Sequence, residues 1–166
     1  MKQKIKHYTK EIIFFLLTMT LFSNLLSLYK SQSLNNTPLT LTHVQLITAK
    51  PYIISQNKPI LIHFWATWCP TCKLEASNIE FLSHHFEVLS IAVNSKDDAT
   101  VQKYLATKGY TFAVVNDPHN QLASAFNVHA FPSTFIYDKH HNLVFSEVGY
   151  TSTLGLWMRM LWAGMK

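Results

Sequence analysis

The sequence predicts an α/β fold in which helices flank a central mixed β-sheet, together with one N-terminal transmembrane helix. Three observations predict it. Apolar runs of strand length alternate with segments of helical spacing, 48% of the 166 residues are hydrophobic, and an uncharged apolar stretch follows a cluster of lysines near the N-terminus. A chain of this length forms about one domain, and its composition is sufficient for a packed core.

The uncharged stretch covers residues 12–29, and as a helix it would be about 27 Å long, close to the thickness of the hydrocarbon core of a bilayer. Residues 1–11 carry four lysines, and positive charge marks the cytoplasmic side of a membrane segment. A cleaved signal peptide would have a shorter apolar stretch and a small-residue cleavage site, which the following KSQSLNN does not provide. We therefore expect an uncleaved single-pass anchor in the bacterial inner membrane, a basic cytoplasmic tail and a periplasmic domain.

Residues 30–42 are polar, contain Pro38 and are predicted to form a tether, which leaves residues 43–166 for the folded domain. The net charge of +5 comes mainly from the N-terminus, because residues 31–166 hold nine basic and eight acidic side chains. Such a domain does not have the basic surface of a nucleic-acid-binding protein. The exported side of a bacterial membrane is oxidising, so a cysteine pair can exist there as a disulfide.

Strands and helices are predicted to alternate along the domain. PILIHFW and FEVLSIAVN are continuous apolar runs, as expected of strands buried on both faces, and YTFAVVND is a third, shorter strand. Helices are predicted at residues 70–84, from Asp97 or Asp98 to Gly109, and at residues 119–128. STFIYDKHHNLVFSEVG predicts a hairpin and STLGLWMRMLWAGM a final helix. This order predicts a mostly parallel sheet with an antiparallel edge, which is the outline of a thioredoxin-type fold.

Both cysteines of the chain, Cys69 and Cys72, lie in WCPTC, where a buried strand is followed by a helix. The N-terminus of a helix stabilises a thiolate, and Cys72, one turn further on, is positioned to attack a mixed disulfide formed at Cys69. A structural disulfide is disfavoured because so short a loop contributes little stability. A zinc site is disfavoured because neither His84–His85 nor His140–His141 has the spacing that would complete one. We therefore expect a redox centre that needs no metal and no cofactor.

Two long segments, ILIHFWATWCPTCKLEA and VVNDPHNQLASAFNVHAFPSTFIYDKHHNLVFSEVGY, resemble the membrane-anchored, TlpA/ResA-like branch of the thioredoxin superfamily, over about residues 50–166. The ending EVGYTSTLGLWMRMLWAG is similar to the ScsD-type protein disulfide oxidoreductases, which are linked as a group to copper tolerance. The resemblance implies a thiol:disulfide oxidoreductase that exchanges electrons with protein substrates and acts as a reductant. It also implies a transmembrane electron donor of the DsbD or ScsB kind.

The resemblance assigns roles to individual residues. Cys69 would be the exposed nucleophile, Cys72 the resolving thiol and Pro132 a cis-proline that faces the dithiol; the alternative for Pro132 is an ordinary trans turn before a strand. The site would be shaped by Phe131, Trp68 and Pro70.

Two further residues are candidates for proton transfer. Glu75 follows Cys72 by three residues, at a place where cytochrome-maturation members of the group also carry a glutamate. His63 stands where thioredoxins proper have a buried aspartate, six residues before the first cysteine. The alternatives are a solvated acid in the first helical turn and a buried histidine without a redox role.

Three other functions remain open from the sequence. A cytochrome c maturation thiol reductase would share the CPTC centre, but VHAFPST lacks the glycine-rich, acidic segment of those proteins. A thiol peroxidase would carry a Pro-x-x-x-Thr-type segment before its cysteine, and FWATWC has no such proline. A copper-binding protein would use the cysteines with some of the nine histidines. The direction of electron flow is also open, because dithiols of this kind differ by about 150 mV in potential, or roughly 7 kcal/mol.

Overall fold

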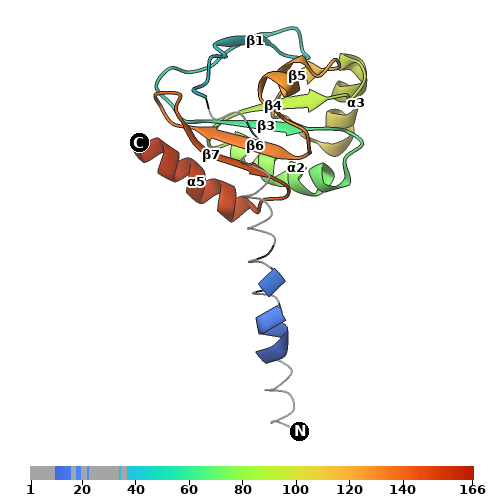
Figure 1. The fold of residues 1–166 in the computed structure, drawn as a ribbon. Coiled ribbons are helices and arrows are strands. Elements are labelled where there is room, and N and C mark those ends of the chain that lie inside the picture. The colour runs from blue at the N-terminus through green and yellow to red at the C-terminus, as the bar shows by residue number, and fades with distance from the viewer. Residues whose placement is uncertain (1–9, 16–17, 20–21, 23–33, 35–36) are drawn as a thin grey trace.

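The computed structural model describes residues 10–15, 18–19, 22, 34 and 37–166. Its centre is a five-stranded sheet with the strand order β5-β4-β3-β6-β7 (Figure 1). The strands are β3 (Ile60–Trp65), β4 (Glu87–Val93), β5 (Ala113–Asp117), β6 (Ser133–Tyr137) and β7 (Leu143–Val148). The helices are α2 (Pro70–Ser83), α3 (Asp98–Lys108), α4 (Gln121–Ala125) and α5 (Thr153–Met165). A separate two-stranded hairpin pairs β1 (His43–Gln45) with β2 (Pro51–Ile53).

The central strand is β3. It pairs in parallel with β4, and β4 pairs in parallel with β5, so that α2 and α3 form the crossovers between parallel neighbours. On its other side β3 pairs antiparallel with β6, which forms an antiparallel hairpin with the edge strand β7. The predicted parallel sheet with an antiparallel hairpin at its edge is therefore confirmed.

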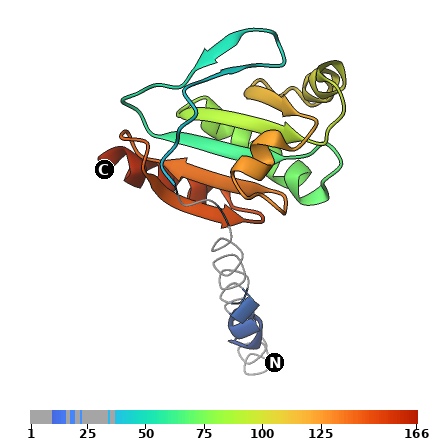
Figure 2. The ribbon, with the colours of Figure 1, turned by 45° about the horizontal axis from the view of Figure 1, so that its top comes forward.

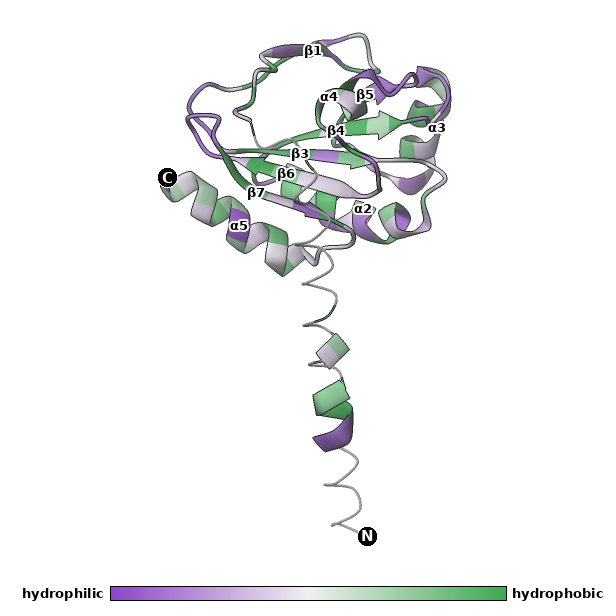
Figure 3. Cartoon of the chain, in the orientation of Figure 1, coloured by the Kyte–Doolittle hydropathy of each residue, from purple (hydrophilic) through white to green (hydrophobic). Residues whose placement is uncertain are grey.

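Helices cover both faces of the sheet (Figure 2). On one face α2, α3 and α5 contribute buried side chains to a common core cluster, for example Ile79, Val101 and Leu156. On the other face the short helix α4 is followed by Phe126, whose ring centroid lies 5.1 Å from that of Phe64 on β3. All six residues of β3 are buried as a result, which is why this strand is a continuous apolar run apart from His63. Figure 3 shows the same hydrophobic character along β4.

Local sequence signals place the ends of α3. Asp97 is its N-cap and accepts a hydrogen bond of 2.8 Å from the backbone N–H of Thr100. Gly109 ends the helix with a φ of 71°, a left-handed conformation that glycine adopts without steric cost. Both ends agree with the prediction. The hairpin of β1 and β2 was not predicted, because strands of three residues carry too short a pattern to be distinguished from loop.

The predicted anchor, residues 12–29, falls mostly outside the described residues. Among the residues that are described, no helix is both long and apolar enough to cross a membrane. Part of the predicted tether belongs to the domain: Leu34 and Leu39 are buried in the core cluster on the α4 face of the sheet, and the backbone N–H of Leu39 donates a hydrogen bond of 2.9 Å to the carbonyl of His141. The apolar side chains of this polar stretch therefore pack against the domain.

The aromatic cluster beneath α4 predicts a large local contribution to stability. Phe135 is fully buried, and its ring centroid lies 5.7 Å from that of Phe64 and 5.3 Å from that of Phe126. Replacing Phe135 by alanine should lower the free energy of unfolding by about 3–5 kcal/mol, because the substitution leaves a cavity in a packed core. Urea unfolding of the two proteins measures this difference.

The matched control is Leu74→Ala, which removes an apolar side chain that is 71% exposed. This change should stay within about 0.5 kcal/mol of the wild type. Equal losses in the two variants would contradict the position of Phe135 in the core.

Candidate active site

Cys69 and Cys72 lie at the junction of β3 and α2 and are joined by a disulfide bond, with their Cα atoms 5.3 Å apart. Cys69 is the N-cap residue of α2, and its Sγ accepts a hydrogen bond of 3.2 Å from the backbone N–H of Cys72. Pro70 occupies the first turn, where the missing N–H costs nothing. The unpaired backbone N–H groups at the N-terminus of α2, among them that of Cys72, would stabilise a negative charge on the Cys69 sulfur once the disulfide is reduced.

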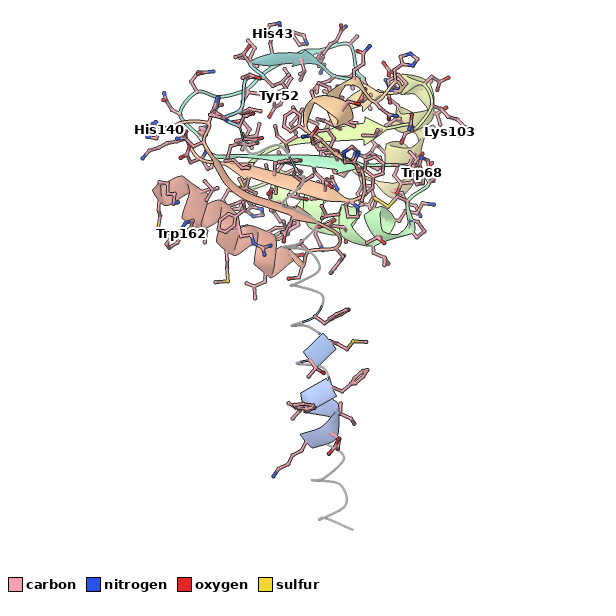
Figure 4. All side chains as sticks on the ribbon, in the orientation of Figure 1. His43, Tyr52, Trp68, Lys103, His140 and Trp162 are labelled. Atoms are coloured by element: carbon pink, nitrogen blue, oxygen red, sulfur yellow. A yellow bond between two sulfur atoms is a disulfide. The ribbon has the colours of Figure 1, made fainter. Side chains whose placement is uncertain are left out.

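A wall formed by the residues before β6 faces the disulfide. The Phe131–Pro132 peptide bond is cis, as the resemblance implies. The carbonyl oxygen of Phe131 lies 3.7 Å from the Sγ of Cys69. The ring of Phe131 meets the ring of Trp68 edge-on at a centroid distance of 5.9 Å, and the indole N–H of Trp68 donates a hydrogen bond of 3.0 Å to the carbonyl of Asn94. Two aromatic rings therefore lie beside the dithiol, and Figure 4 shows the labelled Trp68 next to the disulfide.

The exposure of these residues differs from the expectation in one respect. Trp68 is 56% exposed, whereas Cys69 is only 5% and Cys72 only 2% exposed. The nucleophile is thus more accessible than the resolving cysteine, but it is far less exposed than predicted. The physical reason is that the Phe131 carbonyl lies directly against its sulfur.

A polar hollow lies on the other side of Phe131. Its lining combines this ring with uncharged polar side chains and a histidine, in particular Asn94, Asn120, Ser124 and His129. Sequence reasoning did not find this hollow, since its residues come from separate segments and carry no motif.

Glu75 lies in α2, one turn beyond Cys72, and its side chain is completely buried. Its Oε1 accepts a hydrogen bond of 3.0 Å from the backbone N–H of Thr151, while its Oε2 has no hydrogen-bond partner among the described residues. Burial raises the pKa of Glu75 to about 8, and the nearby carboxylate of Glu147 acts in the same direction. The solvated-acid alternative is therefore wrong, and Glu75 is a buried carboxyl group whose proton exchanges near neutral pH.

Two residues that the sequence did not single out act on this carboxyl group. Thr151 donates a hydrogen bond to it through its backbone N–H, and the carboxylate of Glu147 helps to raise its pKa. Arg159 of α5 forms an ion pair with Glu147 and lies over the ring of Phe145, 5.8 Å from its centroid. These residues lie more than 70 positions after Glu75, so only the folded chain brings them to it.

His63 lies in the middle of β3 and is 2% exposed. Its Nδ1 shares a hydrogen bond of 3.0 Å with the hydroxyl of Thr134 on the neighbouring strand β6. Burial lowers the pKa of His63 to about 3, so that the imidazole is neutral at physiological pH. A neutral, hydrogen-bonded histidine is suited to a structural role, and it has no proton to donate as an imidazolium.

Each of the two histidine pairs contributes a side chain that contacts a nearby group of the domain. Within the described part of the chain, no three side chains of histidine, cysteine, aspartate or glutamate lie close enough together to hold a metal ion. His84 pairs with Glu80, and the Nε2 of His141 lies 3.0 Å from the carbonyl oxygen of Ser55.

Comparison with known proteins agrees with this geometry. Residues 32–146 match the AhpC/TSA family. A thioredoxin-like protein of Haemophilus influenzae is 32% identical over 126 residues, which cover 75% of each chain. The thiol:disulfide interchange protein DsbE of Escherichia coli is 30% identical over 99 residues, but the match spans only 53% of DsbE and 58% of this chain. Among solved structures, a thiol:disulfide interchange protein of the thioredoxin family from Chlorobium tepidum superposes with a TM-score of 0.67 at 25% identity, over 78% of this chain and 97% of that protein.

The matching family covers more than half of the chain, and the relative from Haemophilus influenzae aligns over three quarters of both proteins. The chain therefore belongs to the AhpC/TSA family and, within it, to the thioredoxin-like thiol-disulfide oxidoreductases.

Proposed function

We propose that this protein is a membrane-anchored, periplasmic thiol:disulfide oxidoreductase that reduces disulfides in protein substrates through Cys69 and Cys72. The observation that carries the proposal is the position of Cys69: its sulfur lies at the N-terminus of α2 and against the Phe131 carbonyl. The first feature stabilises the attacking thiolate. The second leaves a backbone acceptor beside the sulfur, to which an extended substrate segment can donate a hydrogen bond.

The reaction transfers two electrons and two protons to the substrate. The Cys69 thiolate attacks one sulfur of the substrate disulfide, so that a mixed disulfide forms and the other substrate sulfur leaves as a thiolate. Cys72 then loses its proton and attacks Cys69, which releases the second substrate thiolate and leaves the Cys69–Cys72 disulfide. The two substrate thiolates take up one proton each.

Glu75 is the proposed acceptor of the Cys72 proton. It lies one helical turn from Cys72, it is buried with it, and its Oε2 has no other hydrogen-bond partner among the described residues. The pKa of its carboxyl group is about 8, which lies within about one unit of the ordinary pKa of a cysteine thiol. This match favours proton transfer in both directions. The neutral His63 is assigned to the structure of the sheet and not to this transfer.

The reducing direction and the location come from the sequence. Residues 12–29 are the proposed single-pass anchor in the bacterial inner membrane, with residues 1–11 in the cytoplasm. Residues 30–42 are the proposed tether, whose Leu34 and Leu39 pack on the domain, and residues 43–166 form the periplasmic domain. Each turnover consumes the reduced dithiol, so the protein requires a transmembrane donor of the DsbD or ScsB kind. The resemblance of the C-terminal segment to ScsD-type proteins, a group linked to copper tolerance, supports this assignment.

Removing the resolving thiol should trap substrates on the protein. Cys72→Ala should accumulate mixed disulfides through Cys69 in intact cells, because no second thiol releases the bound substrate. Alkylation of cells followed by non-reducing electrophoresis measures these adducts, and it shows a mainly reduced pair in the wild type. Cys69→Ala is the matched control and should form none. A wild-type pair that is mainly oxidised would contradict the reducing direction, and absence of adducts together with absence of exchange in vitro would contradict the activity.

Glu75→Gln should slow the release of substrate from the mixed disulfide by about 100-fold, because Cys72 loses its general base. In the wild type the rate of this step should rise with pH and level off above about 8, where Glu75 is ionised. Stopped-flow single-turnover experiments on a model disulfide give both results. The control is Glu80→Gln, which changes a glutamate of the same helix that binds Thr111 instead. The role of Glu75 fails if both variants keep the wild-type pH profile.

Glu75 also predicts a pH dependence of stability. Its folded pKa is raised, so the folded state holds a proton that the unfolded state has already released between about pH 4.5 and 8. Within this window the free energy of unfolding should fall by up to about 1.4 kcal/mol per pH unit as the pH rises, and Glu75→Gln should remove this component. Chemical unfolding of the oxidised proteins, in which no thiol titrates, measures the difference. Parallel curves for the two proteins would be evidence against the raised pKa.

A further inference from the structure

The outward face of α5 is an apolar stripe. It consists of five side chains that are 48–72% exposed, namely Leu154, Met158, Leu161, Trp162 and Met165. Their spacing of four, seven, eight and eleven residues from the first places all five on one side of the helix. Single exposed apolar residues are common on protein surfaces, but a continuous stripe of this length is typical of a site that binds another protein or a membrane.

The opposite face of α5 already carries the contacts with the domain. Leu156 and Met160 are completely buried against the sheet. Trp157, at the border, meets the ring of Phe86 edge-on at a centroid distance of 4.9 Å and that of Phe81 at 5.6 Å. The core of the domain is thus formed by the other face of α5, and the stripe stays exposed in the folded domain.

The charges around α5 are suited to anionic headgroups. The sequence of the helix contains no acidic residue, and its one arginine, Arg159, is paired with Glu147. Near its C-terminal end a β-carbon added to Gly164 would lie 3.7 Å from the ring of Pro59, which is preceded by the exposed Lys58, and α5 is followed by the exposed Lys166. Anionic lipid surfaces attract such basic side chains.

The acidic residues near this end of the domain are held by internal hydrogen bonds. Asp138 accepts bonds of 2.8 Å from the backbone N–H groups of His140 and Asn142, and Glu87 accepts one of 3.0 Å from the N–H of Ser55. Asp138 is only 5% exposed, so its carboxylate is not presented at the surface beside the lysines.

The tether joins the domain at the same end. The N–H of Leu39 bonds the carbonyl of His141 in the turn after β6, and the ring of His141 bonds Ser55, shortly before Pro59. The apolar segment ends at Tyr29, and Leu34 is already buried in the domain. Leu39, which is bonded at this end, follows Tyr29 by ten residues, and ten residues of chain span at most about 36 Å, so an anchored segment would keep this end of the domain within that distance of the bilayer.

We propose that the apolar stripe of α5 lies in the headgroup region of the bilayer, with its side chains directed toward the acyl chains. This inference rests on the membrane anchoring proposed above. The bilayer is the occupant that fits best, because the stripe combines a tryptophan and long apolar side chains with flanking lysines, as helices that lie in the membrane interface do. The dithiol follows the other end of β3, away from the C-terminal part of the stripe, which would leave it open to protein substrates.

Two tryptophans of nearly equal exposure provide the test. Trp162 is 51% exposed on the stripe and Trp68 is 56% exposed beside the dithiol, at opposite sides of the domain (Figure 4). The full chain is reconstituted into vesicles of phosphatidylethanolamine and phosphatidylglycerol that contain a lipid brominated near the headgroup. Brominated lipid should quench the tryptophan fluorescence. Trp162→Phe should lose most of this quenching, and Trp68→Phe should lose none.

The outcomes separate this inference from the anchoring. Equal quenching in the two variants would overturn the position of α5 at the bilayer. A second result would also overturn it: Trp162 is protected from quenching by aqueous iodide, brominated lipid does not quench it, and cross-linking gives dimers. That result would show that a second copy of the chain covers the stripe. An alkaline wash of the same vesicles tests the anchor by itself, because only a chain that spans the membrane resists it. Quenching is measured before the wash, so that it decides the position of α5 whatever the wash shows.

Discussion

The pairing of β3 with its two neighbours is the constraint on which the active site depends. β3 pairs with β6 in a register that sets Phe64 opposite Ser133, so Pro132 and Phe131 come to lie beside the end of β3. The disulfide follows that end by four residues. Because β3 is buried on both faces, this register cannot slip without exposing its apolar side chains. The aromatic wall beside the dithiol is therefore a consequence of the core.

The same pairing creates a polar layer beneath α2. His63, Thr134 and Glu147 are register partners across β3, β6 and β7, and they lie on the face that α2 and α5 cover. Such groups are costly to bury, and each is stabilised by a specific partner: His63 by Thr134, and Glu147 by Arg159. Glu75 is the exception, since only one of its oxygens is bonded. A buried group that is incompletely satisfied and titrates near neutral pH, one turn from a redox cysteine, is suited to moving a proton.

The two ends of β3 differ in their surroundings. At the carboxyl end the chain turns into α2 and presents the dithiol. At the amino end lie Pro59 and the turn between β6 and β7, whose His141 carbonyl accepts a hydrogen bond from Leu39. The helix α5 has two distinct sides, because its inner side supplies Arg159 to the carboxylate of Glu147 and its outer side carries the apolar stripe.

The sequence by itself determined the strands of the central sheet and the helices that flank it, the order that makes this sheet mixed, and the dithiol at the start of α2. These features depend on local patterns: continuous apolar runs, a helix cap at Asp97, a glycine after α3 and a CxxC motif. Only the tertiary structure decided that Glu75 is buried, that Thr151 and Glu147 lie beside it, and that Cys69 is covered by Phe131. A glutamate in the first turns of a helix looks the same in sequence whether it faces solvent or core. Its environment, and hence its pKa, is set by residues more than 70 positions away that the sheet brings into contact.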